Sequence, residues 1–448
     1  MSSSSGELLI ADWVVVNAHE VPLHEAGVRV VDSRVTEVGP AASLLADFPD
    51  DTVHRFGNAV IAPGFVNSHS HTYGVLSHGM TLPSSSGGFG DYLASVWWPY
   101  IEDRLTPDMV STMNELGCAE SLLGGVTTLY DIIEAPFATG ELLPLVAERA
   151  TGTGIRVALS FEATERVSAR NGLAGIEENT SFIEQLATTP HDRATGIMCW
   201  HTSYSCSGRF IREAVDVARS LGVPAQFHCN EGDYEPDRSL NDFGTSTLEY
   251  YQRLDITDAD LIASQSVIMT DAEIDIMADT GVAVVHVPVS NGVFGAGIAP
   301  IPKMLEREIT VGLGTDGFSR DFFEVIRAAS VIHRARHQSS TIMPAATVFD
   351  MATRGGARAL GLDDVGTLET GALADLQVID IDMPTPVTAD NLIEQLVFWR
   401  SAHDVTDVMV HGKWCVRDRQ LSNVDLDRLR WEANRTAAEF WSASEDHV

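Results

Sequence analysis

Eight apolar runs rich in β-branched residues follow one another between residues 64 and 316, and no other feature constrains the fold as strongly. Longer stretches with a helical pattern separate these runs. Buried strands that alternate with helices predict an α/β fold with a parallel sheet, and eight strands are the number that closes a (β/α)₈ barrel of the TIM type. The runs are 64–71, 126–131, 155–160, 196–201, 225–230, 260–267, 282–288 and 310–316.

Short strands without long helices occupy the sequence on both sides of these runs. The simplest topology has the two ends of the chain fold together into one small β-sandwich domain, with the barrel inserted between them. We therefore expect residues 1–62 to form the first part of that domain and residues 63–362 to form the barrel. Residues 363–448 then complete the small domain and add a C-terminal helix.

The charge and the cysteine content of the 448-residue chain indicate which kinds of partner it can bind and in which compartment we expect it. Its 63 acidic residues outnumber 29 lysines and arginines, for a formal net charge of −34. Such a surface repels phosphate backbones and anionic headgroups, so we expect no nucleic-acid and no membrane partner. The five cysteines form no CxxC pair, and the first residues lack the basic region of a signal peptide. Both features favour reduced thiols and a cytoplasmic location.

Two histidines lie at the end of the first apolar run, in Asn67-Ser-His-Ser-His71. Side chains two residues apart on a strand point to the same side, so His69 and His71 project together. Two imidazoles side by side can ligate one metal ion. They can equally be two polar residues at a strand end, and this motif alone does not decide between the alternatives.

Three further residues lie at the carboxyl ends of other runs. His228 ends the fifth run, with Glu231 three residues later, and Asp316 ends the eighth run. Active sites of barrels are built at this one rim, which makes a joint metal site stronger than any single motif. A carboxylate beside such a site can take a proton from water and return it. Taken singly, Glu231 could be a solvated acid and Asp316 a helix cap.

Several motifs spread over nearly the whole chain resemble the amidohydrolase superfamily. The chain is most similar to its aminohydrolase branch, which includes cytosine, S-adenosylhomocysteine and chlorotriazine hydrolases. Ser160-Phe-Glu-Ala-Thr-Glu-Arg166 looks closest to poorly characterised aminohydrolases associated with selenium metabolism. The other motifs are Pro63-Gly-Phe-Val-Asn-Ser-His-Ser-His71, Leu116-Gly-Cys-Ala-Glu-Ser-Leu-Leu-Gly-Gly-Val-Thr-Thr128, His228-Cys-Asn-Glu231, Leu313-Gly-Thr-Asp-Gly317 and Gly366-Thr-Leu-Glu-Thr-Gly-Ala-Leu-Ala-Asp-Leu376.

The resemblance implies a catalytic role for the residues at the rim. His69, His71, His228 and Asp316 would bind one divalent metal ion per chain, zinc first, with iron, manganese or cobalt as alternatives. The metal would carry a bound hydroxide, Glu231 would carry a proton from water to the leaving nitrogen, and Asp316 would accept a hydrogen bond from the hydroxide. The resemblance also implies a homodimer or tetramer.

One position departs from the pattern of these relatives, which usually have a histidine at the end of the sixth strand. Gln265 stands there, and an amide can donate or accept a hydrogen bond but cannot carry a proton. Gln265 could take an altered catalytic part, His286 on the seventh run could supply the missing imidazole, or activity could be weak or lost. We favour retained catalysis because the four metal ligands and Glu231 are all present.

Four residues are candidates for contact with a small-molecule substrate. His201 and His286 follow from the resemblance, while Tyr73 and His78 lie on the segment after the first run. The favoured function is hydrolytic deamination of an amino-substituted purine, pyrimidine, pterin or triazine. The alternative keeps the metal site but hydrolyses a chloro-, urea-, carbamate- or thiocarbamate-type substrate. A non-catalytic binding protein is the third and least favoured interpretation.

Overall fold

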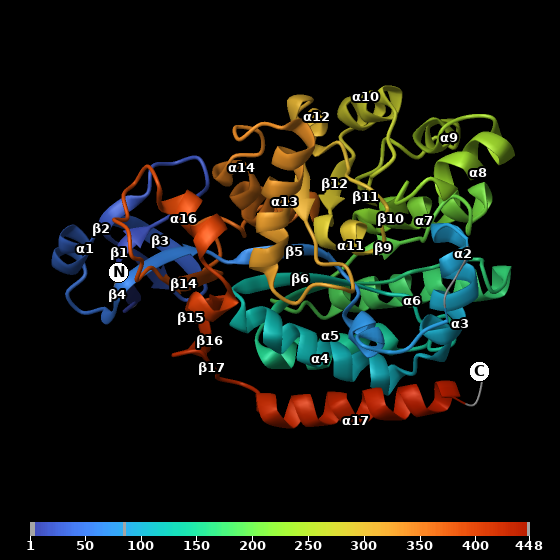
Figure 1. Ribbon diagram of the computed structural model, residues 1–448. Coiled ribbons are helices and arrows are strands. Elements are labelled where there is room, and N and C mark those ends of the chain that lie inside the picture. The colour runs from blue at the N-terminus through green and yellow to red at the C-terminus, as the bar shows by residue number, and fades with distance from the viewer. Residues whose placement is uncertain (1–4, 84–86, 446–448) are drawn as a thin grey trace.

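A parallel sheet of nine strands forms the centre of the computed structural model, which describes residues 5–83 and 87–445 (Figure 1). This confirms the prediction of an α/β fold with a parallel sheet. The runs expected from the sequence all supply strands to it. In spatial order these are β8 (Ala194–Gly196), β7 (Arg156–Phe161), β6 (Val126–Ile133), β5 (Phe65–Ser70), β13 (Val311–Leu313), β12 (Ala283–His286), β11 (Leu261–Gln265), β10 (Ala225–Cys229) and β9 (Met198–Cys199).

The two outermost strands of this sheet, β8 and β9, belong to one stretch of chain. Only Ile197 separates them, and its backbone N–H donates to Leu159 O on β7 at 3.0 Å. On the other side, Met198 N donates to Pro224 O beside β10 at 3.1 Å. Residues 194–199 therefore bond to β7 with their first half and to β10 with their second half.

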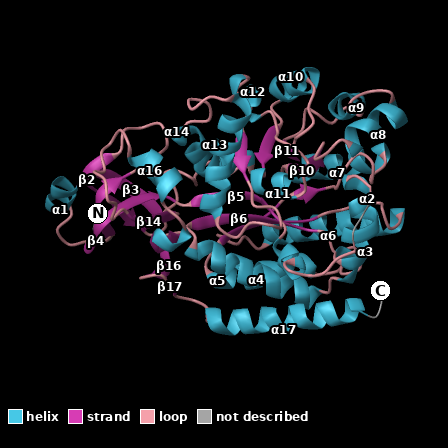
Figure 2. Ribbon diagram, in the orientation of Figure 1, coloured by secondary structure: helices cyan, strands magenta, loops and turns pink. Residues whose placement is uncertain are grey.

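Helices follow most strands and pack around the parallel sheet (Figure 2). Local sequence explains where several of them start: Pro107 takes the first turn of α4, and Thr270 with Glu273 forms a capping box on α10. No helix in the described ranges is both long and apolar enough to span a bilayer. The helices around this sheet are α4 (Pro107–Leu123), α5 (Leu142–Thr153), α6 (Ala169–Thr188), α7 (Gly208–Leu221), α8 (Tyr234–Phe243), α9 (Thr247–Arg253), α10 (Asp271–Thr280), α11 (Pro288–Val293), α12 (Ile301–Glu306), α13 (Phe322–His337), α14 (Ala345–Asp350) and α15 (Gly356–Ala359).

A second sheet combines strands from both ends of the chain, because β4 pairs antiparallel with β14. Its eight strands form one hydrogen-bonded order, and the predicted sandwich stays a prediction. Backbone bonds also return from β3 to the segment before β14, including Val35 N to Ala372 O at 2.9 Å. Strand pairing of this kind leaves no trace in the apolar pattern. The order is β17 (Gln420–Leu421), β16 (Lys413–Arg417), β15 (Val405–Val410), β14 (Leu376–Asp380), β4 (Thr52–Pro63), β1 (Glu7–Val14), β2 (Leu23–Val31) and β3 (Arg34–Pro40).

The two sheets share one large apolar core, and the terminal sheet has a smaller core of its own. The C-terminal helix α17 (Leu426–Glu445) lies along α4, where Arg428 pairs with Glu115 at 3.3 Å (Figure 1). The remaining helices are α1 (Ala41–Asp47), α2 (Phe89–Tyr92), α3 (Trp98–Tyr100) and α16 (Leu392–Trp399). Short 3₁₀ turns at Thr72–Ser77, Glu102–Arg104 and Ala402–Asp404 and π turns at Leu93–Trp97 and Met351–Gly355 join these elements.

Candidate active site

Three histidine rings meet at the carboxyl ends of strands β5 and β10. His69 and His71 come from the end of β5, and His228 comes from β10, four strands away in the sheet order. Their ring centroids lie 5.0 to 5.3 Å apart, and each residue is at least nine-tenths buried. One nitrogen of each ring lies within 4.8 Å of the others. The structure thus brings together the three histidines expected to bind a metal.

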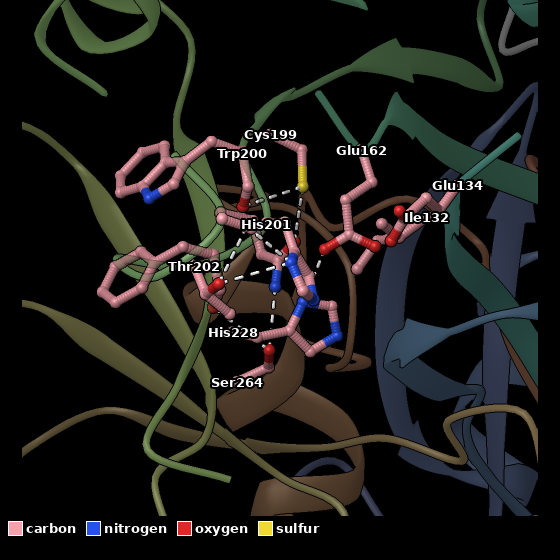
Figure 3. Close-up of polar contacts among 12 residues, drawn as sticks. Ile132, Glu134, Glu162, Cys199, Trp200, His201, Thr202, His228 and Ser264 are labelled. Atoms are coloured by element: carbon pink, nitrogen blue, oxygen red, sulfur yellow. Dashed lines mark hydrogen bonds and ion pairs between the residues drawn. The ribbon is translucent and has the colours of Figure 1, made fainter. Parts of the chain in front are cut away.

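Hydrogen bonds fix which ring nitrogens of His71 and His228 face each other. His71 Nδ1 lies 2.8 Å from the carbonyl oxygen of Ile132, which can only accept, so Nδ1 carries the proton. His228 Nδ1 lies 2.6 Å from Glu162 Oε1 (Figure 3). In the neutral rings both Nε2 atoms therefore carry lone pairs, and these two atoms are 3.2 Å apart. Two lone pairs at that distance repel unless a cation lies between them, either a metal ion or the proton that a pKa of about 9 leaves on His228.

This donor set fits a divalent metal ion. Two nitrogens that each lie ~2.0–2.1 Å from a tetrahedral zinc ion are ~3.3 Å apart, close to the observed separation of the two Nε2 atoms. Buried His69 Nδ1 has no hydrogen-bond partner among the described residues. Carbonyl and carboxylate partners behind the metal-facing nitrogens are the usual way in which proteins orient such ligands.

Asp316 and Gln265 lie beside the three histidines. Asp316 Oδ1 is 3.9 Å from His71 Nε2, and its carboxylate accepts hydrogen bonds from Ser290 Oγ at 2.7 Å and Gly317 N at 2.6 Å. Gln265 Nε2 lies 3.4 Å from both His69 Nε2 and Asp316 Oδ2. The amide therefore occupies the space between a histidine and the carboxylate, where it holds Asp316 in place.

Glu231 lies in the same pocket as His71, His228 and Asp316. Burial and the nearby Asp316 carboxylate raise the pKa of Glu231 to about 8. A carboxyl group with a pKa close to neutrality can both take up and release a proton.

Two of the four expected substrate contacts line this pocket. Tyr73 donates a hydrogen bond to Glu102 Oε1 at 3.1 Å. His201 bonds through Nδ1 to Ser205 Oγ at 2.7 Å, and burial lowers the pKa of its ring to about 3. His201 is therefore neutral, and it stays a predicted substrate contact together with Tyr73.

The other two expected contacts, His78 and His286, do not line the pocket. His78 Nε2 is engaged with Gly317 O at 2.7 Å. His286 packs against His333 of α13, with ring centroids 5.4 Å apart. The alternation of strand β12 causes this, because Val285 and Val287 face the interior and His286 faces the surrounding helices. No contact between His286 and the three-histidine cluster supports it as a substitute for the missing imidazole.

Sequence analysis did not single out three buried glutamates that line the pocket, Glu102, Glu134 and Glu162. Glu162 contacts His228, and this ion pair outweighs burial and lowers the pKa of Glu162 to about 2. At His228 burial lowers the pKa of the ring, but the adjacent Glu162 carboxylate raises it by more. The pKa of His228 is therefore about 9. Glu134 and Glu162 each follow directly after a strand of the parallel sheet, β6 and β7. The strand-end rule that pointed to Asp316 would have found both.

The chain is similar to known proteins over almost its whole length. The model of the amidohydrolase family matches residues 60–415. A 5-methylthioadenosine/S-adenosylhomocysteine deaminase of Syntrophobacter fumaroxidans is 32% identical over 443 residues, covering 96% of this chain and 97% of the relative. Another protein of that name, from Carboxydothermus hydrogenoformans, is 30% identical over 434 residues, covering 96% and 97%.

Solved structures share the fold over almost the whole chain. An adenosine deaminase from Xanthomonas campestris with bound zinc superposes with a TM-score of 0.86 at 25% identity, covering 98% of this chain and 99% of that one. An atrazine chlorohydrolase from Arthrobacter aurescens complexed with zinc gives a TM-score of 0.82 at 21% identity, covering 96% and 100%.

Proposed function

The chain belongs to the amidohydrolase family, and from that premise we propose that it releases ammonia by hydrolysis from an amino-substituted heterocycle. The observation that carries this proposal is the pair of facing Nε2 atoms of His71 and His228 beside Asp316 and Glu231. A cation between these atoms and a titratable carboxyl group next to it are the two parts that hydrolytic deamination requires.

His69, His71, His228 and Asp316 would hold one divalent metal ion, and zinc is our first choice because two of the solved relatives contain it. Such an ion lowers the pKa of a bound water molecule toward neutrality. The tight contact between Glu162 and His228 keeps that ring in the ligating orientation.

In the proposed reaction Glu231 takes a proton from the attacking water and later gives it to the leaving nitrogen. The water oxygen bonds to the ring carbon that bears the amine, which becomes tetrahedral. The carbon–nitrogen bond then breaks with its electron pair on nitrogen, so ammonia leaves, and the proton left on the oxygen passes to the ring nitrogen as the carbonyl forms. Asp316 accepts a hydrogen bond from the water, and Gln265 steadies Asp316 by donating to it.

We also infer a closed eight-stranded barrel, supported by residues 194–199 bonding to both β7 and β10. Closure explains how His71 and His228 meet although their strands are four apart in the sheet order. The five free and buried cysteines support the proposed cytoplasmic location. Assembly into a dimer or tetramer stays a prediction.

Replacing Glu231 tests the proposed reaction. We expect Glu231→Gln to lower ammonia release by about 10²–10⁴-fold, because the amide cannot carry the proton. Metal content per chain should stay at the wild-type level, since Glu231 is not a ligand. The assay is ammonia release from a panel of aminopurines, aminopyrimidines, pterins and aminotriazines, with metal analysis of the same samples.

Glu177→Gln, at an exposed position of α6, is the matched control and should behave as wild type. Wild-type turnover in Glu231→Gln would contradict the role given to Glu231. Metal-loaded wild type that releases ammonia from no member of the panel would contradict the proposed function itself.

A further inference from the structure

The wall of the active-site pocket is rich in acidic side chains and, among the described residues, contains no lysine or arginine. Fifteen residues line it, all within the described part of the chain, and five of them are carboxylates while none is a lysine or an arginine. The pocket therefore disfavours the binding of an anionic ligand.

One guanidinium group, that of Arg166, lies just behind this wall, but carboxylates already occupy it. Its Nη1 pairs with Asp103 at 2.8 Å, its Nη2 pairs with Glu102 at 3.3 Å, and its Nε pairs with Glu134. Its face also covers the ring of Trp98, with 4.9 Å between Cζ and the ring centroid. Arg166 thus neutralises part of the cluster, and each of its three nitrogens already bonds to a carboxylate.

Glu134 and Glu162 each keep one carboxylate oxygen without a partner among the described residues. Only Oε1 of Glu134 meets Arg166, and only Oε1 of Glu162 meets His228. Both residues are at least 98% buried and both line the pocket, and Figure 3 shows Glu134 beside Glu162. A carboxylate oxygen that lines a pocket without a donor can accept a hydrogen bond from a ligand, so a ligand with N–H groups would fill both places.

Aromatic rings form the rest of the wall and point independently to a flat ligand. Six of the lining residues are aromatic, among them Trp97, Trp98 and Phe318. Such rings bind planar groups through their faces, and they bind cations more strongly than neutral molecules.

We propose that the pocket selects a planar cation, an amidinium- or guanidinium-bearing heterocycle, whose N–H groups are bound by Glu134 and Glu162. This inference rests on the proposed function, because the amidinium carbon is the amine-bearing carbon that deamination attacks. Positive charge on that carbon favours attack by water, and two carboxylates stabilise it. Burial raises the pKa of Glu134, the paired Arg166 guanidinium opposes this shift, and the nearby Glu162 carboxylate adds to it.

An isosteric pair of probes tests this charge preference by binding alone. Benzamidine is a planar cation at neutral pH, and benzamide has the same shape without the charge. Dissociation constants of both are measured by titration calorimetry on the metal-loaded wild type, on Glu134→Gln and on Glu165→Gln. Glu165 is the matched control because it lies next to Arg166, bonds to Ser207 N and does not line the pocket.

We expect benzamidine to bind wild type and Glu165→Gln about 10-fold or more tightly than benzamide, the worth of one charge-assisted hydrogen bond. In Glu134→Gln the two probes should bind within about 3-fold of each other. Equal binding of the probes to wild type would overturn the proposal without any variant. A preference that survives in Glu134→Gln would overturn the role of Glu134.

This test separates the inference from the proposed function. If benzamidine binds selectively but no heterocycle releases ammonia, the proposed cation preference is supported and the proposed deaminase function is contradicted. If neutral heterocycles release ammonia and the two probes bind equally, the deaminase function is supported and the cation preference is contradicted.

Discussion

Glu162 controls the orientation of one residue in the histidine cluster. Its Oε1 lies 2.6 Å from His228 Nδ1, which leaves Nε2 facing the other histidines. The sequence showed that His69, His71 and His228 end strands, and strand geometry was enough to place them at one rim. It did not show Glu162 as their partner, because that contact joins strands β7 and β10 across the fold.

Removing the charge of Glu162 should weaken metal binding without removing a ligand. We expect Glu162→Gln to lower metal affinity by about 10–100-fold, the usual effect of a lost partner behind a ligating histidine. Competition with a chelator of known affinity measures it. Glu165→Gln should bind metal as wild type does, and an unchanged affinity in Glu162→Gln would contradict the orienting role.

The role of Gln265 could not be predicted from the sequence alone. Its identity departs from the family pattern, and the sequence allowed several consequences, including replacement of the imidazole by His286. The structure places the amide between His69 and Asp316 and directs His286 to the outer helices. Which face a strand residue presents depends on the register of the whole sheet, which one sequence does not reveal.

At the scale of elements, the helices of the parallel sheet begin with local signals that the sequence carries. Helix α9 begins with a capping box. The Ser246 side chain accepts a hydrogen bond from the backbone N–H of Glu249, and the Glu249 side chain accepts one from the backbone N–H of Ser246. Hydrogen bonds from Thr245 and Ser246 lower the pKa of Glu249 to about 2 from an ordinary value of 4.5. The charged carboxylate is therefore the form that stabilises the folded protein.

This shift predicts how stability depends on pH in a Glu249→Gln variant. The stabilisation is complete above the ordinary pKa of 4.5 and is lost as the pH falls toward 2. At pH 7 the variant should be less stable by about 1 kcal/mol or less, the cost of a lost cap at a partly exposed position. Urea unfolding at pH 7 and pH 3.5 should show the difference shrinking at the lower pH.

Glu213→Gln, an exposed glutamate on α7, provides the control and should differ from wild type at neither pH. A destabilisation of Glu249→Gln that is equally large at pH 7 and pH 3.5 would mean that the carboxylate charge plays no part in the cap.

At the scale of the whole molecule, one buried ion pair joins the two sheets. Arg156 on β7 pairs with Asp375, just before β14, at 2.8 Å, and both side chains are more than nine-tenths buried. The sequence predicted that both chain ends share one domain, since strand patterns return after the barrel. It predicted neither this contact nor the single sheet, because long-range pairing depends on three-dimensional packing.

Breaking this pair should destabilise the protein far more than breaking a surface pair. We expect Asp375→Ala to cost about 3–5 kcal/mol, because Arg156 is left buried without its partner. Asp364→Ala removes the exposed pair with Arg34 and should cost about 0–1 kcal/mol. Chemical unfolding measures both variants, and similar losses would show that the Arg156–Asp375 contact does not link the sheets.

The pairing of β4 with β14 determines when the terminal sheet can form during synthesis. Strand β4 ends at Pro63, but its partner begins at Leu376. At about 5–20 residues per second, a ribosome needs roughly 15–60 s to make the chain between them. Until then one edge of β4 is unpaired, and open edges favour association with other nascent chains. The rate of translation, more than the stability of the finished sheet, sets how long that edge is uncovered.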